Sequence, residues 1–122
     1  MKNILLVASA LLFAIPAMAQ HAHQQGPNGG PMEDVAGLHV EMVVSGKMLT
    51  FHILDEAIKP LSTAGFSGSS LLSAGGDRET LPLTASDNVL KGEAKGDIAK
   101  GASVSITLKT ADGKSGQAKF RH

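Results

Sequence analysis

The stretch "LHVEMVVSGKMLTFHI", residues 38–53, decides the fold. Apolar side chains occupy alternate positions in two runs, which are Leu38, Val40, Met42 and Val44, and then Leu49, Phe51 and Ile53. A period of two over such lengths is typical of half-buried β-strands. Ser45-Gly46 between the runs is a credible tight turn. The stretch therefore predicts a β-hairpin with one face in the core.

The register of this hairpin follows from the parity of its apolar positions. The buried set is even-numbered in the first strand and odd-numbered in the second, so both sets face the core only if paired residue numbers sum to an odd number. With Ser45-Gly46 as the loop, Val40 faces Phe51 and, on the outer side, His39 faces His52. Opposed Cβ atoms lie about 4.5–5.5 Å apart, a reach at which two imidazoles can share a metal ion.

Two alternatives to this histidine pair stay open. A loop shifted by one residue makes His39 and His52 diagonal neighbours on the same outer face. Histidines on a solvated strand face also need not bind anything. Glu41 and Met48 share the expected outer face, and carboxylate and thioether groups can both ligate metals.

Downstream segments continue the strand pattern. Further short strands are predicted at residues 69–73, 78–83, 89–94, 104–108 and 118–120, with turn residues between them. The last two form a hairpin in which Ala111-Asp112-Gly113 fits a three-residue loop with Gly113 in the left-handed conformation. About seven short strands with regular turns predict an all-β fold, a small antiparallel immunoglobulin-like β-sandwich preceded by a flexible tail.

The beginning of the chain reads as an export signal. Lys2 precedes an apolar run of twelve residues, and Ala17-Met18-Ala19 offers the small-x-small pattern of a cleavage site. The alternative is a membrane anchor, but a spanning helix needs about 20 apolar residues. We therefore expect a signal peptide at residues 1–19, a flexible His/Gly/Pro tail at 20–34 and a β-sandwich domain at 35–122. No membrane insertion is expected after cleavage, and the domain should fold without the tail.

Composition excludes several classes of function. The chain of 122 residues has 11 Lys or Arg, 11 Asp or Glu, and no cysteine. It has no basic block, so nothing favours nucleic acid or anionic lipid as a partner. "GFSGS", residues 65–69, lacks the final glycine of a nucleophile elbow, and no His-Glu-x-x-His motif is present. We predict that the protein is not an enzyme.

Histidines are the candidate metal ligands. His21 and His23 stand one residue apart in a segment with no apolar period to bury them, and His39 and His52 are the strand pair. Imidazole suits zinc, copper and nickel. A His-x-His tail is an adaptable chelator, or else a polar linker with incidental histidines. The expected cofactor is a copper or zinc ion, and otherwise none.

The segment "HAHQQGPNGGPMEDVAGLHVEM", residues 21–42, followed by a Phe-x-Ile-x-Asp strand and Lys59-Pro60, resembles a group of small periplasmic proteins. It is also similar to the His-rich amino-terminal segment and β-domain of periplasmic adaptor subunits of heavy-metal efflux pumps. The carried pattern is His21 and His23, the Gly29-Gly30 pair, and Gly37, His39 and Glu41. Asn28 stands where that family often carries histidine.

The resemblance implies metal handling in the periplasm of a Gram-negative bacterium. We therefore expect a periplasmic metal-binding accessory protein that weakly binds a divalent or copper ion and passes it to a component of a heavy-metal efflux system. The alternative from a different class is a metal-free immunoglobulin-like module that binds a protein, for example at a sheet edge.

Overall fold

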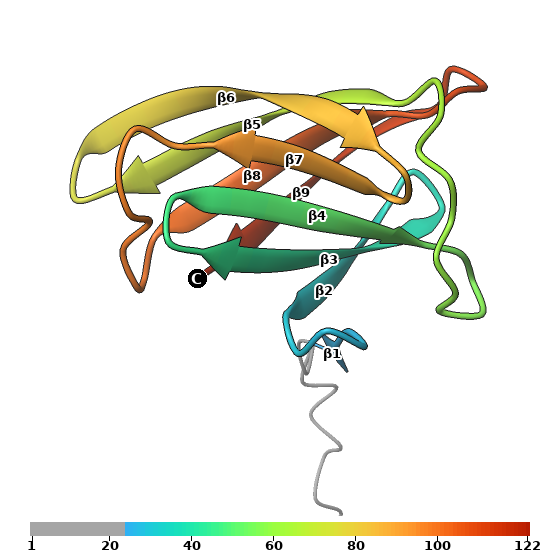
Figure 1. The fold of residues 1–122 in the computed structure, drawn as a ribbon, viewed down its shortest axis with the longest axis horizontal. Coiled ribbons are helices and arrows are strands. Elements are labelled where there is room, and N and C mark those ends of the chain that lie inside the picture. The colour runs from blue at the N-terminus through green and yellow to red at the C-terminus, as the bar shows by residue number, and fades with distance from the viewer. Residues whose placement is uncertain (1–23) are drawn as a thin grey trace, which may run out of the picture.

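The structure is a computed structural model, and it describes residues 24–122. This part of the chain is all-β, with nine antiparallel strands and no helix (Figure 1). The strands are β1 (Gln24–Gln25), β2 (Pro31–Val35), β3 (Leu38–Ser45), β4 (Met48–Leu54), β5 (Ser67–Ala74), β6 (Asp77–Ser86), β7 (Val89–Glu93), β8 (Ser103–Lys109) and β9 (Ser115–Arg121).

The strands form one continuous curled sheet in the order β1-β2-β3-β4-β7-β6-β5-β8-β9. The sheet folds over because β6 changes partner along its length: residues 77–83 pair with β5, and residues 84–86 pair with β7. One layer then contains β3, β4 and β7, and the other contains β5, β8 and β9 (Figure 1). The order β3-β4-β7-β6 and β5-β8-β9 matches the ABED and CFG sheets of an immunoglobulin constant-type sandwich.

The core lies between the two layers and is built almost entirely from aliphatic side chains. Phe51 of β4 and Phe120 of β9 meet across it, with ring centroids 5.7 Å apart and planes tilted by 53°. Around them pack the buried apolar residues Val35, Val40, Met42, Leu49, Ile53, Leu72, Leu81, Leu83, Leu90, Ala94, Ile98, Ala102, Val104, Ile106 and Leu108. Each apolar set named for the first hairpin therefore faces the core, as its alternation predicts.

The β3–β4 register differs from the predicted one by one loop position. The two-residue turn is Gly46-Lys47, and Gly46 takes its left-handed φ of 59°. Glycine has no Cβ and adopts this φ without strain, whereas Ser45 in that position would be strained. As a result Met42 faces Phe51, and the predicted direct pairing of His39 with His52 is wrong.

The far hairpin has the predicted form. Ser103 pairs with Arg121 and Lys109 with Ser115, so the paired numbers have the expected even sum. The Thr110 N–H donates to Lys114 O at 2.8 Å, and Gly113 has a φ of 87°. The three residues between Thr110 and Lys114 are therefore the loop, with glycine at the left-handed position.

The tail expected at residues 20–34 is wrong for residues 24–34. They form β1, a tight turn and most of β2, and β2 pairs along β3 with Met32 opposite Glu41 and Val35 opposite Leu38. Residues 1–23, with the predicted signal peptide at 1–19 and with His21 and His23, lie outside the described residues. Among residues 24–122, no helix is long and apolar enough to cross a membrane.

Candidate functional site

The outer face of β2, β3 and β4 gathers most of the polar side chains that the sequence singles out. One cross-strand row runs through Met32, Glu41, His52 and Val89, from β2 to β7. The neighbouring row runs through Asp34, His39 and Leu54. Cross-strand neighbours on one face lie within contact distance, so the register brings two carboxylates and two imidazoles into one region.

Glu41 is the centre of this region, and it is fully buried although it lies on the outer face. The turn between β1 and β2 folds over it and supplies only donors. The backbone N–H of Asn28 donates to both carboxylate oxygens at 2.9 and 3.2 Å, and its side-chain amide donates to Oε1 at 2.9 Å. The Gly30 N–H donates to Oε2 at 2.8 Å. Such a donor set matches an ionised carboxylate, which can only accept.

Two glycines let the turn approach Glu41 this closely. A Cβ on Gly26 would lie 2.3 Å from Glu41 Cδ, and a Cβ on Gly30 would lie 2.0 Å from the backbone oxygen of Met42. Gly30 therefore cannot carry a side chain without a shift of the β3 backbone, and a side chain at Gly26 would displace the Glu41 carboxylate from its donors. We call residues 26–30 with Glu41 the carboxylate latch, because together they fix the β1–β2 hairpin to β3.

His39 lies beside Asp34 at the start of β3. Its Nδ1 is 2.7 Å from Asp34 Oδ1, but the ring N–H is not aligned with that oxygen, and Nδ1 is buried without a hydrogen bond to any described residue. The Asp34 side chain is 80% exposed. Nδ1 therefore lies close to the Asp34 carboxylate without a hydrogen bond that would fix the ring.

His52 lies opposite Glu41 and diagonally from His39, which is the alternative arrangement that the sequence allows. It is half-buried. Both oxygens of Glu41 are already occupied by the latch, so this carboxylate has no vacant position toward the imidazoles. In residues 24–122 no group of three or more His, Cys, Asp or Glu side chains is placed to hold a metal ion.

His122 is a histidine apart from this face. Its backbone pairs with the loop before β8 through bonds to Gly101 and Ala102. Burial lowers the pKa of its imidazole below 6.5, and the nearby Lys100 ammonium lowers it further. Both causes act against the charged ring.

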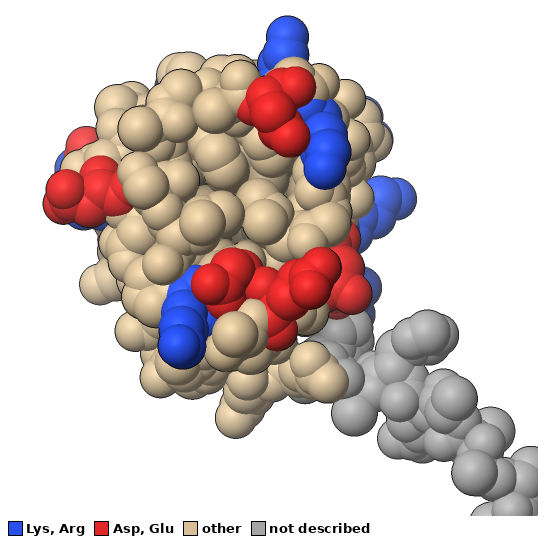
Figure 2. Space-filling view, turned by 90° about the vertical axis from the view of Figure 1, so that its right-hand side faces the viewer, with Lys and Arg blue, Asp and Glu red and all other residues tan. Residues whose placement is uncertain are grey.

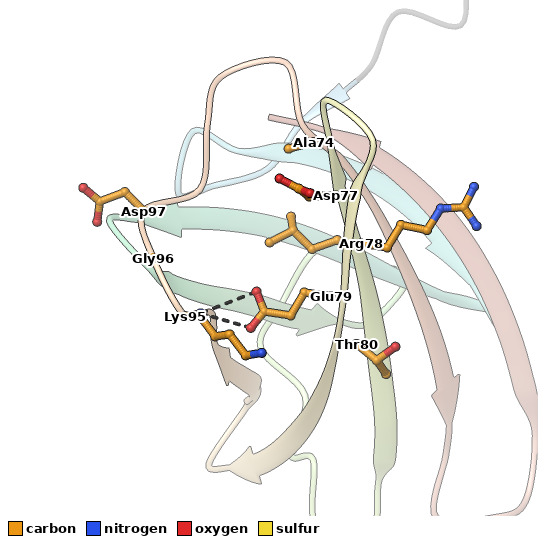
Figure 3. Close-up of a pocket in the computed structure, with 9 residues that line it drawn as sticks. Ala74, Asp77, Arg78, Glu79, Thr80, Lys95, Gly96 and Asp97 are labelled. Carbon is orange, nitrogen blue, oxygen red and sulfur yellow. Dashed lines mark hydrogen bonds between the residues drawn. The ribbon is translucent and has the colours of Figure 1, made fainter.

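A depression of about 560 Å³ lies between β6 and the loop after β7 (Figure 3). Glu79 accepts the Lys95 N–H there at 3.0 and 3.4 Å. Asp77, Lys95 and Asp97 also line this depression, whereas the Arg78 side chain extends away from it (Figure 3). This hydrogen bond connects the loop after β7 to β6, so Glu79 has a structural role here.

A second depression, of about 610 Å³, lies at the end of the sandwich where the β2–β3 turn meets the loops before β5 and after β8. Leu38, Leu61 and Phe66 line it, all half-buried, together with Ala36 and Ala111. Figure 2 faces this end and shows charged side chains in separate groups around an uncharged surface. The arrangement suits contact with an apolar group.

Sequence reasoning missed the latch. In the sequence Asn28 stands out only as a residue where the resembling family often has histidine, yet it supplies two of the donor groups that bind Glu41. The available signal was the run "GPNGG", residues 26–30, placed shortly before a strand with one acidic residue between apolar neighbours. Glycines that precede a strand in this way permit close backbone approach.

Comparisons of the chain with protein-family models, with curated proteins and with solved structures find no match.

Proposed function

We propose that the protein is an exported, periplasmic metal-binding accessory protein whose His21 and His23 are the main ligands for a copper or zinc ion. One observation carries the proposal. The latch anchors the chain at Asn28 and Gly30, and β1 begins at Gln24, directly after His23. A chelating His-x-His pair would thus be attached to a rigid domain at a fixed point rather than at the end of a long linker.

His39 and His52 supply a separate, weaker site in this proposal. They share a face, and Asp34 lies beside one ring nitrogen of His39. A small rotation of the exposed Asp34 side chain would let it accept the His39 ring N–H, the arrangement that orients metal-binding histidines and leaves the other nitrogen to the metal. Two imidazoles without a third protein ligand should bind weakly and leave positions for water or a partner's side chain.

The partner in this proposal is a periplasmic component of a heavy-metal efflux system, which receives the ion. This part rests on the resemblance of residues 21–42 to the amino-terminal region of efflux adaptors. The protein acts by binding and not as an enzyme, without insertion into the membrane after signal cleavage.

The test is calorimetric titration of Cu(II) and Zn(II) into the protein from Gln20 to His122. Three proteins are compared: wild type, His21→Ala/His23→Ala and His39→Ala/His52→Ala. Loss of the stronger binding phase in the first variant and of a weaker phase in the second supports the proposal. Binding should also weaken as pH falls through about 6.5, since protonated imidazole cannot ligate. Identical isotherms for all three proteins exclude the histidines as ligands.

The second candidate is a metal-free immunoglobulin-like interaction module. The depression lined by Leu38, Leu61 and Phe66 favours it, because half-buried apolar side chains at one end of a sandwich can accept an apolar side chain of a partner. Identical isotherms in the titration above would make this the better function.

A further inference from the structure

The outer face of the second layer has an unusual distribution of charge. Its positions are the odd-numbered residues of β5, β8 and β9 and the even-numbered residues of 77–83 in β6, as the registers of these strands require. Four of them are cationic, namely Arg78, Lys109, Lys119 and Arg121, and none is acidic. We call this surface the basic face.

The four cations are available to a ligand. All four are exposed, and no ion pair joins any of them to another side chain of residues 24–122. The acidic neighbours along β6 point to the other side of the strand, since Figure 3 shows Arg78 extending away from Glu79. Glu33 lines an adjacent depression with Arg121, at one corner of the face. The basic face is therefore positive although the whole chain has equal numbers of basic and acidic residues.

Hydroxyl groups form the floor between the cations. Most of the remaining positions are serine or threonine. A shallow depression of about 510 Å³ runs over Ser73, Ser103 and Ser105, with Leu71 beside Ser105. Arg78 borders it on the β6 side, and Lys119 and Arg121 border it on the β9 side. With strands about 4.8 Å apart, these borders are about 14 Å apart at the backbone, so long side chains from both sides can reach one ligand between them.

The apolar content of the face distinguishes between possible polyanions. Leu71 is the one large apolar side chain exposed on it, at 37%, and none of its positions is aromatic. Lipid surfaces bind such faces through buried apolar area as well as charge. A row of hydroxyl groups flanked by cations instead matches a polymeric ligand in which each repeating unit carries both an anionic group and hydroxyl groups.

We propose that the basic face binds an acidic polysaccharide, laid over the serine floor between Arg78 and the Lys119–Arg121 pair. Lysine and arginine contact its carboxylate or sulfate groups, and the serine hydroxyl groups hydrogen-bond to its sugar hydroxyls. The strands of the face extend for about 20 Å, enough for several sugar units. This inference does not depend on metal binding.

The experiment measures binding of alginate and heparin, a carboxylated and a sulfated polysaccharide, with neutral dextran as a reference. The test variants are Lys119→Thr/Arg121→Thr and Arg78→Thr. The matched control is Lys59→Thr/Lys91→Thr, which removes the same charge as the double variant from exposed positions off the basic face. Thermal unfolding checks that each variant is folded.

Wild type should bind both acidic polymers and not dextran, with affinity that falls as salt rises. Each cation that contacts a charged surface is expected to contribute about fivefold to the affinity. Lys119→Thr/Arg121→Thr should therefore weaken binding about tenfold or more, and Arg78→Thr should weaken it severalfold. The control should weaken binding less than twofold. Equal weakening in the two double variants would overturn the proposal, because net charge alone would then explain binding. Binding to phosphatidylglycerol vesicles but to neither polysaccharide would also overturn it, in favour of a membrane surface.

Discussion

Replacing Glu41 by glutamine should release the β1–β2 hairpin while the sandwich stays folded. Glutamine keeps the size of the side chain and one oxygen, but it presents an NH₂ group where the second oxygen now accepts hydrogen bonds. If the NH₂ group takes the Oε2 position, the Asn28 N–H and the Gly30 N–H both face another donor. If it takes the Oε1 position, these two donors keep their acceptor, but that acceptor is no longer charged.

The magnitude follows from these bonds. A hydrogen bond to a charged group contributes about 1.5–3 kcal/mol and one to a neutral group about 0.5–1.5 kcal/mol, so loss of the charge weakens each of the two backbone bonds to Oε2, at 2.9 and 2.8 Å, by about 1–1.5 kcal/mol. Part of this is offset, because the carboxylate no longer has to be removed from water and the released turn can hydrate. We expect hairpin opening to become easier by about 2–4 kcal/mol, or roughly 30- to 900-fold in the protection of its amides.

Hydrogen exchange followed by NMR measures this effect residue by residue. In Glu41→Gln the Asn28 and Gly30 amides should lose protection, while amides of the core strands β4 and β8 change far less. Glu56→Gln, an exposed carboxylate in the loop after β4, is the matched control and should leave all of these amides unchanged. If Asn28 and Gly30 exchange as slowly in Glu41→Gln as in wild type, strand pairing alone holds the hairpin and the latch is not its cause.

Three other predictions concern the latch and its surroundings. Gly30→Ala should expose the same amides because its Cβ would clash with Met42 O, whereas Gly96→Ala, with open space around it, should not; hydrogen exchange compares the two. Deleting residues 20–30 should lower the thermal midpoint more than deleting 20–23, since only the longer deletion removes the donors of Glu41. NMR titration should give a pKa for His122 below 6.5, and Lys100→Ala should raise it partway. Because the folded pKa is the lower one, stability should fall as pH drops from about 6.5 to that pKa and then level off, and His122→Gln should remove this component in denaturant unfolding.

Alternation predicts the four strands β3, β4, β8 and β9, because their core-facing apolar residues recur with a period of two. The strands β5, β6 and β7 are predicted instead from short stretches between turn residues. Alternation failed for β2, where Met32 and Val35 are both buried but lie three positions apart on opposite faces. Met32 lies in the outer row beside the buried Glu41, and Val35 lies in the core, so the buried residues of "PMEDV" have no period of two. The burial of Glu41 also goes against the pattern, because a polar residue between apolar neighbours in an alternating run is predicted to be exposed.

The register error has a local cause. Both Ser45-Gly46 and Gly46-Lys47 satisfy the parity of the apolar residues, and only the conformation of the first turn residue decides between them. Glycine takes the left-handed position, so the loop begins at Gly46. That shift of one position is enough to place Glu41, and not His39, opposite His52. A metal site predicted from a single cross-strand pair therefore depends on the turn, because a turn that begins one residue later changes which residues are paired.

The basic face was hidden from composition for a related reason. Arg78 lies more than 30 positions before the two β9 cations, so no basic block exists along the chain, and the expectation that neither nucleic acid nor anionic lipid is favoured as a partner rests on that absence. Strand order brings the residues together, because β5 and β8 place β6 and β9 on either side of a serine floor. The strand histidines and the polysaccharide site then fall on different layers: His39 and His52 lie on the outer face of β3 and β4, and the polysaccharide site lies on the outer face of β5, β8 and β9. A ligand on one face leaves the other uncovered, so loss of metal binding in the histidine variants should leave polysaccharide binding intact, and the Lys119–Arg121 variant should bind metal like wild type.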